Sequence, residues 1–142
     1  MATIKRFEDL EIWKLARKLA QDIFETYNES QAFCMDYQLK NQINDSSGSI
    51  LDNIAEGFER NSRNEFINFL SYSKGSTGEV KSQLYRALDR KYILNEKFQN
   101  YYSQADVLAK KIASFIKYLN SSNVKGSKFK ERIATDNGTF KP

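Results

Sequence analysis

Residues 54–70 read IAEGFERNSRNEFINFL, and this stretch decides the fold. Ser62 followed by Glu65 is the capping-box pattern S-x-x-E, which marks the start of a helix when apolar residues follow directly. Before the turn, Ile54 and Phe58 stand four residues apart, which places them on one face of a preceding helix. The stretch therefore predicts two helices that meet in a short turn and pack as antiparallel neighbours.

Apolar residues continue both helical faces away from this turn in steps of three and four. On the helix predicted from Asp36 to Arg60, which Asp36 is expected to cap, the face consists of Leu39, Ile43, Ser47, Ile50, Ile54 and Phe58. On the helix predicted from Ser62 to Lys91 or Tyr92, it consists of Phe66, Leu70, Ser73, Thr77, Val80, Leu84 and Leu88.

Two further segments have the same period. The first runs from Phe7 to Tyr27, and residues 28–34 after it are expected to be a loop. The last begins at Asn95, an expected N-cap, ends around Asn120, and its apolar face consists of Phe98, Tyr102, Ala105, Leu108, Ile112, Phe115, Ile116 and Leu119. Four helices of similar length with short links predict an all-α, antiparallel up-down-up-down four-helix bundle over residues 1–120. Residues 121–142 are polar and basic and are expected to be a tail without its own core, although Phe129, Ile133 and Phe140 offer docking side chains.

Composition excludes most catalytic chemistry. The chain has 142 residues, no His and one Cys, so His-dependent nucleophiles, His-ligated metals and multi-cysteine zinc sites are ruled out. We therefore predict a non-enzymatic protein with no catalytic, cofactor-binding or metal-binding residues and no small-molecule substrate. The charged N-terminus and the shortness of the apolar runs argue against a signal peptide and a membrane span, and the free thiol of Cys34 fits a cytoplasmic protein.

Charge is divided unevenly between the two halves of the chain. Residues 1–60 carry seven Lys and Arg against eleven Asp and Glu, whereas residues 61–142 carry fifteen against seven. This asymmetry indicates an anionic partner for the second half, or helices that attract one another. The candidate nucleic-acid-binding residues are Lys74, Lys81, Arg86, Arg90, Lys91, Lys97, Lys110, Lys111 and Lys117.

Part of this basic set is expected to gather. Arg86, Arg90, Lys91 and Lys97 should meet at the turn between the third and fourth helices, with Tyr85, Tyr92 and Tyr101 interleaved. Basic side chains can contact phosphates while aromatic rings stack on unpaired bases. An ordinary solvated face is the alternative interpretation of the same pattern.

A polar stripe accompanies the apolar face on the two central helices. Its members are Gln42, Ser46, Ser49, Asn53, Glu56, Ser76, Glu79 and Gln83, and Arg60, Arg86 and Arg90 extend it at its ends. Antiparallel pairing places Ser49 level with Ser76, and the stripe is interpreted as a solvated face, as polar packing that sets the register, or as a ligand groove. Glu56 and Glu79 would stand about 15 Å apart along the axis, too far to act as a catalytic pair.

Small residues interrupt both central helices. Lys74-Gly75-Ser76 lacks the spacing of a phosphate-binding loop and follows a helix rather than a strand. Gly48, Gly75 and Gly78 are therefore expected to permit close helix packing. The 19 aromatic residues exceed the needs of one bundle core, and Ile67, Phe69, Tyr72, Tyr85 and Tyr118 fall outside it, which favours a homo-oligomer.

These residues form motifs that resemble a known family. The motifs are the segment from Phe7 to Trp13 with Ala16, Gln42-Ile43 with Ser49-Ile50 and Asn53 to Gly57, and Phe66 to Leu70 with Lys74-Gly75-Ser76 and Glu79. Over residues 5–120 they resemble the 23S rRNA intervening-sequence proteins, also called four-helix-bundle proteins. A more distant resemblance is to the accessory protein of diversity-generating retroelements, a basic pentamer that associates with reverse transcriptase and nucleic acid.

The resemblance implies a bacterial, cytoplasmic four-helix bundle that forms an oligomer such as a pentamer, and it brings no catalytic residues. Cys34 stands where the family usually has Pro, and Gly78 stands where Ala is common. The sequence thus predicts a bundle that binds RNA or a nucleoprotein complex through the basic face of its third and fourth helices. A protein-interaction scaffold without affinity for nucleic acid is the alternative.

Overall fold

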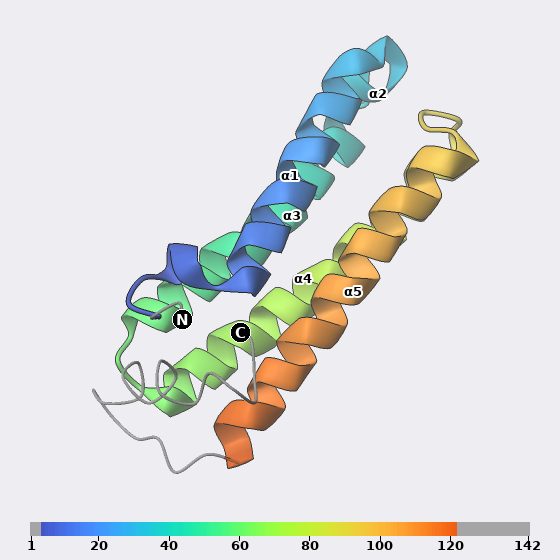
Figure 1. Cartoon of the computed structure of the whole chain (residues 1–142). Helices are drawn as coiled ribbons and strands as arrows, with labels where there is room; N and C mark the ends of the chain where they lie inside the picture. The colour runs from blue at the N-terminus through green and yellow to red at the C-terminus, as the bar shows by residue number, and fades with distance from the viewer. Residues whose placement is uncertain (1–3, 122–142) are drawn as a thin grey trace.

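The computed structural model describes residues 4–121 and confirms the all-α class (Figure 1). The elements are the short 3₁₀ helix η1 (Phe7–Asp9), α1 (Glu11–Glu29), α2 (Gln31–Met35), α3 (Tyr37–Glu59), α4 (Arg63–Asp89) and α5 (Asn95–Ser121). These residues contain no β-strand. The predicted tail lies outside the described residues, apart from Ser121, which ends α5.

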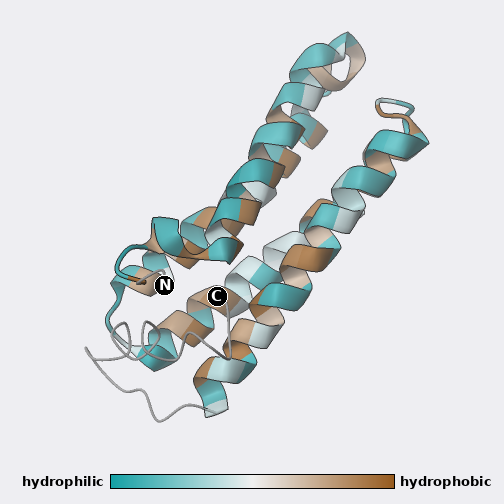
Figure 2. Cartoon of the chain, in the orientation of Figure 1, coloured by the Kyte–Doolittle hydropathy of each residue, from teal (hydrophilic) through white to brown (hydrophobic). Residues whose placement is uncertain are grey.

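The four long helices pack in chain order, α1 against α3, α3 against α4 and α4 against α5, and α1 also contacts α5. Each helix contributes fully buried apolar side chains to one core, for example Leu19, Ile50, Leu70 and Leu108. In Figure 2 the hydrophobic residues follow stripes along the helices, with hydrophilic residues between the stripes. This arrangement is the predicted up-down-up-down bundle.

The start of the first helix differs from the prediction. Residues Phe7–Asp9 form a separate 3₁₀ turn, and Leu10 has extended backbone, with φ −74° and ψ 128°. The break allows Leu10 to be fully buried and lets the ring of Phe7 lie edge-on to that of Trp13, with centroids 5.2 Å apart. Helical spacing alone does not reveal the break, because residues 7 and 10 remain apolar neighbours on either side of it.

The prediction of a loop over residues 28–34 is wrong in part. Residues Gln31–Met35 form α2, whose N-cap is Ser30, since the Ser30 hydroxyl accepts a hydrogen bond from the backbone N–H of Phe33 at 3.2 Å. Five residues are too few to display a helical repeat of apolar positions, so the pattern gave no signal. Asp36 caps α3 as predicted, because its carboxylate accepts from the N–H of Leu39 at 3.2 Å.

The capping box before α4 is also confirmed for the hydrogen bond that the serine hydroxyl accepts. Ser62 is the N-cap, and its hydroxyl accepts from the N–H of Glu65 at 3.3 Å. Asn61 supplies the left-handed conformation of the turn, with φ 55°, which Asn tolerates better than most residues. Three residues therefore reverse the chain and set α4 against α3.

The expectation that Gly48, Gly75 and Gly78 permit close helix packing is wrong for all three. A Cβ at Gly48, Gly75 or Gly78 would meet nothing within 4 Å, so these positions face open space. The close approach of α3 and α4 lies instead at Gly57, where a Cβ would stand 2.6 Å from Cβ of Phe69. Serine side chains, rather than glycines, line the contact in the middle of these helices, as described next.

Candidate nucleic-acid interface

Ion pairs within the bundle engage most of the predicted basic residues. The pairs are Lys81 and Lys110 with Asp106 (2.8 and 3.0 Å), Arg90 with Asp36 (2.6 Å), Lys97 with Glu29 (3.5 Å) and Lys111 with Glu11 (3.0 Å). The last three join α4 or α5, or their ends, to acidic residues of the first half of the chain. Part of the charge asymmetry therefore serves attraction between helices.

The four cations expected at the turn between α4 and α5 are dispersed. Arg86 donates to the side-chain oxygen of Gln42 on α3 at 2.7 Å, and Arg90 also points to α3. Lys97 points to α1, which leaves Lys91 as the only one of the four whose side chain forms no hydrogen bond or ion pair with the described residues. No concentrated anion site forms at this turn.

Asp36 is the centre of the contact between the α4 end and the α3 start. Its carboxylate accepts from the Tyr92 hydroxyl at 2.8 Å, from the backbone N–H of Leu39, and from Arg90. The hydrogen bond from Tyr92 is the largest cause that lowers the pKa of Asp36 below its ordinary value, followed by the N–H of Leu39 and then by Arg90. The same bond to Asp36 raises the pKa of Tyr92.

This lowered pKa predicts a pH-dependent contribution to stability. Because the folded carboxyl ionises at lower pH than the unfolded one, the contribution is complete at neutral pH and is lost as the pH falls below about 4 through the folded pKa. An Asp36→Asn variant, which keeps a capping side chain, is expected to be less stable than the parent by about 1 kcal/mol at pH 7. Urea unfolding at pH 7 and pH 3 should show that this difference shrinks at the lower pH. A constant difference would contradict the assignment.

The tyrosines divide into buried and accessible rings. Tyr92 stacks on Phe33 with centroids 5.2 Å apart, and Tyr101 is buried with its hydroxyl 2.6 Å from that of Thr26. Neither ring is free to stack on a base. Tyr85 is 50% exposed and packs at the boundary of α4 and α5, 5.7 Å from the ring of Tyr102.

The outer surface between α4 and α5 combines these rings with lysines. We call it the lysine–tyrosine face, and it consists of Lys74, Lys81, Tyr85, Tyr102, Lys110 and Lys117. The ammonium of Lys81 lies 5.2 Å from the ring centroid of Tyr102, a cation–π distance. Lys74 stands seven residues before Lys81 and therefore shares its side of α4.

The antiparallel pairing also brings Lys117 to this face. Lys81 with Asp106 and Tyr85 with Tyr102 set the register, which places Lys74 level with residues near the end of α5 that include Lys117. Lys74 and Lys117 form no ion pair within residues 4–121. Hydrogen bonds from Lys81 and Lys110 lower the pKa of Asp106, so the acid of this face stays ionised and offsets only one of the four lysines.

Sequence reasoning missed Tyr102 as an accessible residue, because its spacing from Phe98 and Ala105 places it on the apolar face of α5. The structure has it at the edge of that face, half-buried. Its position next to Lys81 depends on the packing angle of α4 against α5. That angle cannot be predicted from the apolar repeat of a single helix.

The polar stripe of α3 and α4 comes together as expected. The hydroxyl of Ser76 donates to that of Ser49 at 3.1 Å, and the Ser46 hydroxyl donates to the side-chain oxygen of Gln83. Ser73, which was expected on the apolar face, donates to the backbone carbonyl of Ile50 at 2.8 Å. Buried hydroxyls thus join the two helices at fixed levels.

The middle of the stripe forms an open groove of about 550 Å³ between α3 and α4. Of the predicted residues, the groove is lined by Gln42, Ser46, Ser49, Glu79, Gln83 and Arg86. The other two members on α3 lie outside it: Asn53 bonds to Ser49 of its own helix at 2.8 Å, and Glu56 pairs with Arg60 at 2.8 Å. Asp45, which the sequence pattern did not single out, completes one rim.

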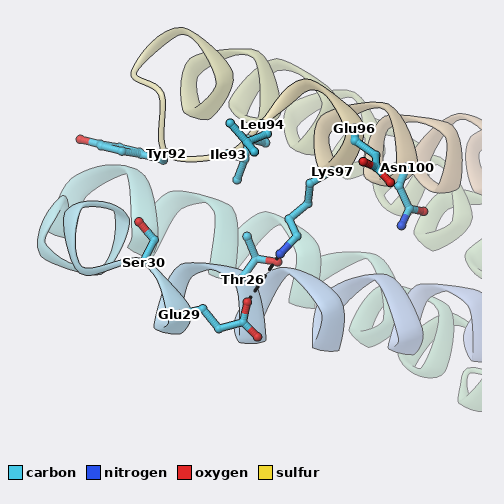
Figure 3. Close-up of a pocket in the computed structure, with 9 residues that line it drawn as sticks. All are labelled: Thr26, Glu29, Ser30, Tyr92, Ile93, Leu94, Glu96, Lys97 and Asn100. Atoms are coloured by element: carbon cyan, nitrogen blue, oxygen red, sulfur yellow. Dashed lines mark ion pairs between the residues drawn. The ribbon is translucent and has the colours of Figure 1, made fainter.

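A second pocket, of about 520 Å³, lies where the end of α1 meets the start of α5 (Figure 3). Thr26 and Glu29 of α1 face Lys97 and Asn100 of α5 across it, and Leu94 lies at the α5 start. The ion pair between Lys97 and Glu29 crosses this pocket and neutralises its one cation. No sequence motif predicted it, because its walls come from the end of α1 and from the turn before α5, which are far apart in the chain.

Two features are absent from the described residues. Within residues 4–121 no three His, Cys, Asp or Glu side chains come together in a way that could hold a metal ion. Over the same span, none of the helices has both the length and the apolar character needed to cross a lipid bilayer.

Comparison with known proteins identifies relatives of this bundle. The family described as 23S rRNA-intervening sequence protein matches residues 8–114. A crystal structure of a protein of unknown function from the S23 ribosomal protein family of Bacteroides thetaiotaomicron VPI-5482 is 25% identical, with a TM-score of 0.67. The alignment covers 75% of this chain and 98% of that one. A comparison with curated proteins found no match.

Proposed function

Because the chain belongs to the 23S rRNA-intervening sequence protein family, we propose that it is a non-enzymatic, oligomeric helical-bundle protein that binds RNA, alone or in a nucleoprotein complex. The RNA would bind the lysine–tyrosine face. The observation that carries this proposal is the half-exposed ring of Tyr85 on a face with four lysines, of which only Lys81 and Lys110 pair with a carboxylate, that of Asp106.

The lysine–tyrosine face offers two kinds of contact to RNA: lysines for the phosphates and a tyrosine ring for the bases. Lys74 and Lys117 have no acidic partner within the described residues and are placed to neutralise phosphates. The exposed ring of Tyr85 offers a surface on which an unpaired base can stack, a contact that tolerates any sequence. Binding of this kind is weak, sensitive to salt and selective for single-stranded segments.

A salt titration of RNA affinity tests the proposal. For the double variant Lys74→Gln/Lys117→Gln, the plot of log affinity against log salt is expected to become shallower by about 0.7 for each lost contact to single-stranded RNA. Tyr85→Ala is expected to weaken binding about tenfold at constant salt. The matched control is Lys5→Gln/Lys14→Gln, which removes the same charge at exposed positions before and on α1, outside the lysine–tyrosine face.

Filter binding of a single-stranded RNA to the full chain measures all three variants. Absence of RNA binding at low salt would contradict the proposal. An effect of the control variant equal to that of Lys74→Gln/Lys117→Gln would also contradict it. The controls also separate local contacts from the net charge of the protein.

The second candidate function is a protein-interaction scaffold without affinity for nucleic acid. It is favoured by the ion pairs that engage five of the nine predicted cations. Exposed apolar side chains also stand at the end of the bundle that contains α2: Met35 is 60% exposed and Leu94 is 81% exposed. Light scattering with and without RNA separates the two functions, since the scaffold keeps its mass when RNA is added.

A further inference from the structure

The groove between α3 and α4 has an acidic residue on each rim, Asp45 on α3 and Glu79 on α4. Asp45 lies one turn from Ser49 on α3, and Glu79 lies one turn from Ser76 on α4. Because the hydroxyls of Ser49 and Ser76 are hydrogen-bonded at 3.1 Å, the antiparallel helices place the two carboxylates level with each other across the groove. Neither forms an ion pair within residues 4–121.

The one cation that lines the groove is already engaged. A guanidinium nitrogen of Arg86 donates to the side-chain oxygen of Gln42 at 2.7 Å, one to two turns from Glu79. With two carboxylates and one guanidinium, the groove has net negative charge. A phosphate-bearing ligand would be repelled there, and a cationic ligand would be attracted.

The floor of the groove presents an unused hydrogen-bond donor. Gln83 is only 8% exposed, and its side-chain oxygen accepts from the buried hydroxyl of Ser46. That bond fixes the carboxamide orientation and leaves its NH₂ group lining the groove without an acceptor among the described residues. This NH₂ group has no acceptor on the described part of the protein, and a ligand that brings an acceptor oxygen can bond to it.

These three observations define the ligand by its chemistry. It must offer several donors and a positive charge to two level carboxylates, and a carbonyl oxygen to the floor. A planar guanidinium supplies donors in a fork that matches carboxylates, and a peptide backbone supplies the carbonyl. We propose that the groove binds an arginine of a partner protein, its guanidinium between Asp45 and Glu79 and a neighbouring peptide carbonyl accepting from Gln83.

This site is separate from the lysine–tyrosine face. Lys81 follows Glu79 by two residues, and positions two apart on a helix point to different sides. RNA and a basic protein segment could therefore occupy the bundle together. The groove extends the proposed function to the protein component of a nucleoprotein complex, and it does not depend on RNA binding.

The test is a titration of the full chain with a short neutral peptide that carries one arginine, compared with the same peptide carrying citrulline. Citrulline keeps the shape and loses the charge. Side-chain amide signals of Gln83 in an NMR titration report occupancy of the groove. We expect the arginine peptide to shift these signals. We expect the citrulline peptide to bind at least about tenfold more weakly.

Variants of the chain complete the test. Asp45→Asn/Glu79→Gln is expected to weaken the arginine peptide about tenfold, since both neutralised groups are exposed and nearly isosteric with the originals. The matched control Asp52→Asn/Asp89→Asn removes one exposed carboxylate from each of the same helices outside the groove and should have no effect. Equal binding of the two peptides, or an equal effect of the two double variants, would overturn the proposal.

The readouts distinguish this proposal from the RNA proposal. Lys74→Gln/Lys117→Gln should leave peptide binding unchanged, and Asp45→Asn/Glu79→Gln should not weaken RNA binding. If the chain does not bind RNA but does bind the peptide, the proposed function is contradicted and the arginine site is supported. If it binds RNA but not the peptide, only the arginine site is contradicted.

Discussion

Replacing Phe33 with alanine is expected to lower the free energy of unfolding by about 3–5 kcal/mol, the largest effect among the substitutions considered. Phe33 belongs to the five-residue helix α2, yet only 2% of its surface is exposed. Its ring stacks on Tyr92 at 5.2 Å and meets the edge of Tyr27 at 6.0 Å. The substitution leaves a cavity between α2, α1 and the end of α4, because three separate segments cannot close on it together.

Chemical denaturation of the variant and the parent measures this effect. The control is Met35→Ala in the same short helix, whose side chain is 60% exposed, and we expect a change within about 0.5 kcal/mol. A loss below about 1 kcal/mol for Phe33→Ala would show that α2 is not anchored to the core.

Replacing Gly57 with alanine is expected to cost about 1–3 kcal/mol through overpacking. The added Cβ would stand 2.6 Å from Cβ of Phe69 and 2.9 Å from a ring carbon of Phe66. Cβ of Phe69 is fixed to the α4 backbone, so relief requires α3 and α4 to move apart. That movement would loosen the edge-on contact between Phe58 and Phe66.

Gly75→Ala is the matched substitution, since it adds the same atom to α4 where nothing lies within 4 Å. Alanine has a higher helix propensity, so this variant is expected to be more stable than the parent by about 1 kcal/mol. Thermal unfolding of the two variants should therefore give shifts of opposite sign. Shifts of the same sign would contradict the assignment of the close approach to Gly57.

Local signals in the sequence were sufficient to predict the four-helix bundle. The apolar repeats gave four long helices, and the caps at Asp36 and Ser62 gave two of their starts. Both kinds of signal arise from neighbours within one or two turns, which the sequence contains directly. The family resemblance drawn from the same residues is likewise confirmed.

Features that depend on packing between distant segments were harder to predict. The register of Ser49 and Ser76 followed from the turn length, but the exposure of the glycines did not, because spacing does not say which side of a helix a neighbour covers. The ion pairs of Arg90 and Lys111 could not be predicted from the sequence either. Their partners, Asp36 and Glu11, lie far away in the chain, and only the rotation of each helix brings them into reach.

The three-residue turn at Asn61 and Ser62 has a consequence for the order of folding. Closing a loop this short costs little chain entropy, so α3 and α4 can pair as a hairpin on the microsecond timescale. The contact between α1 and α5 joins Thr26 to Tyr101, which are 75 residues apart, and forms only after the chain has been brought back on itself. Hydrogen exchange should therefore be slowest along the α3–α4 hairpin and fastest, among the long helices, at the boundary of α1 and α5.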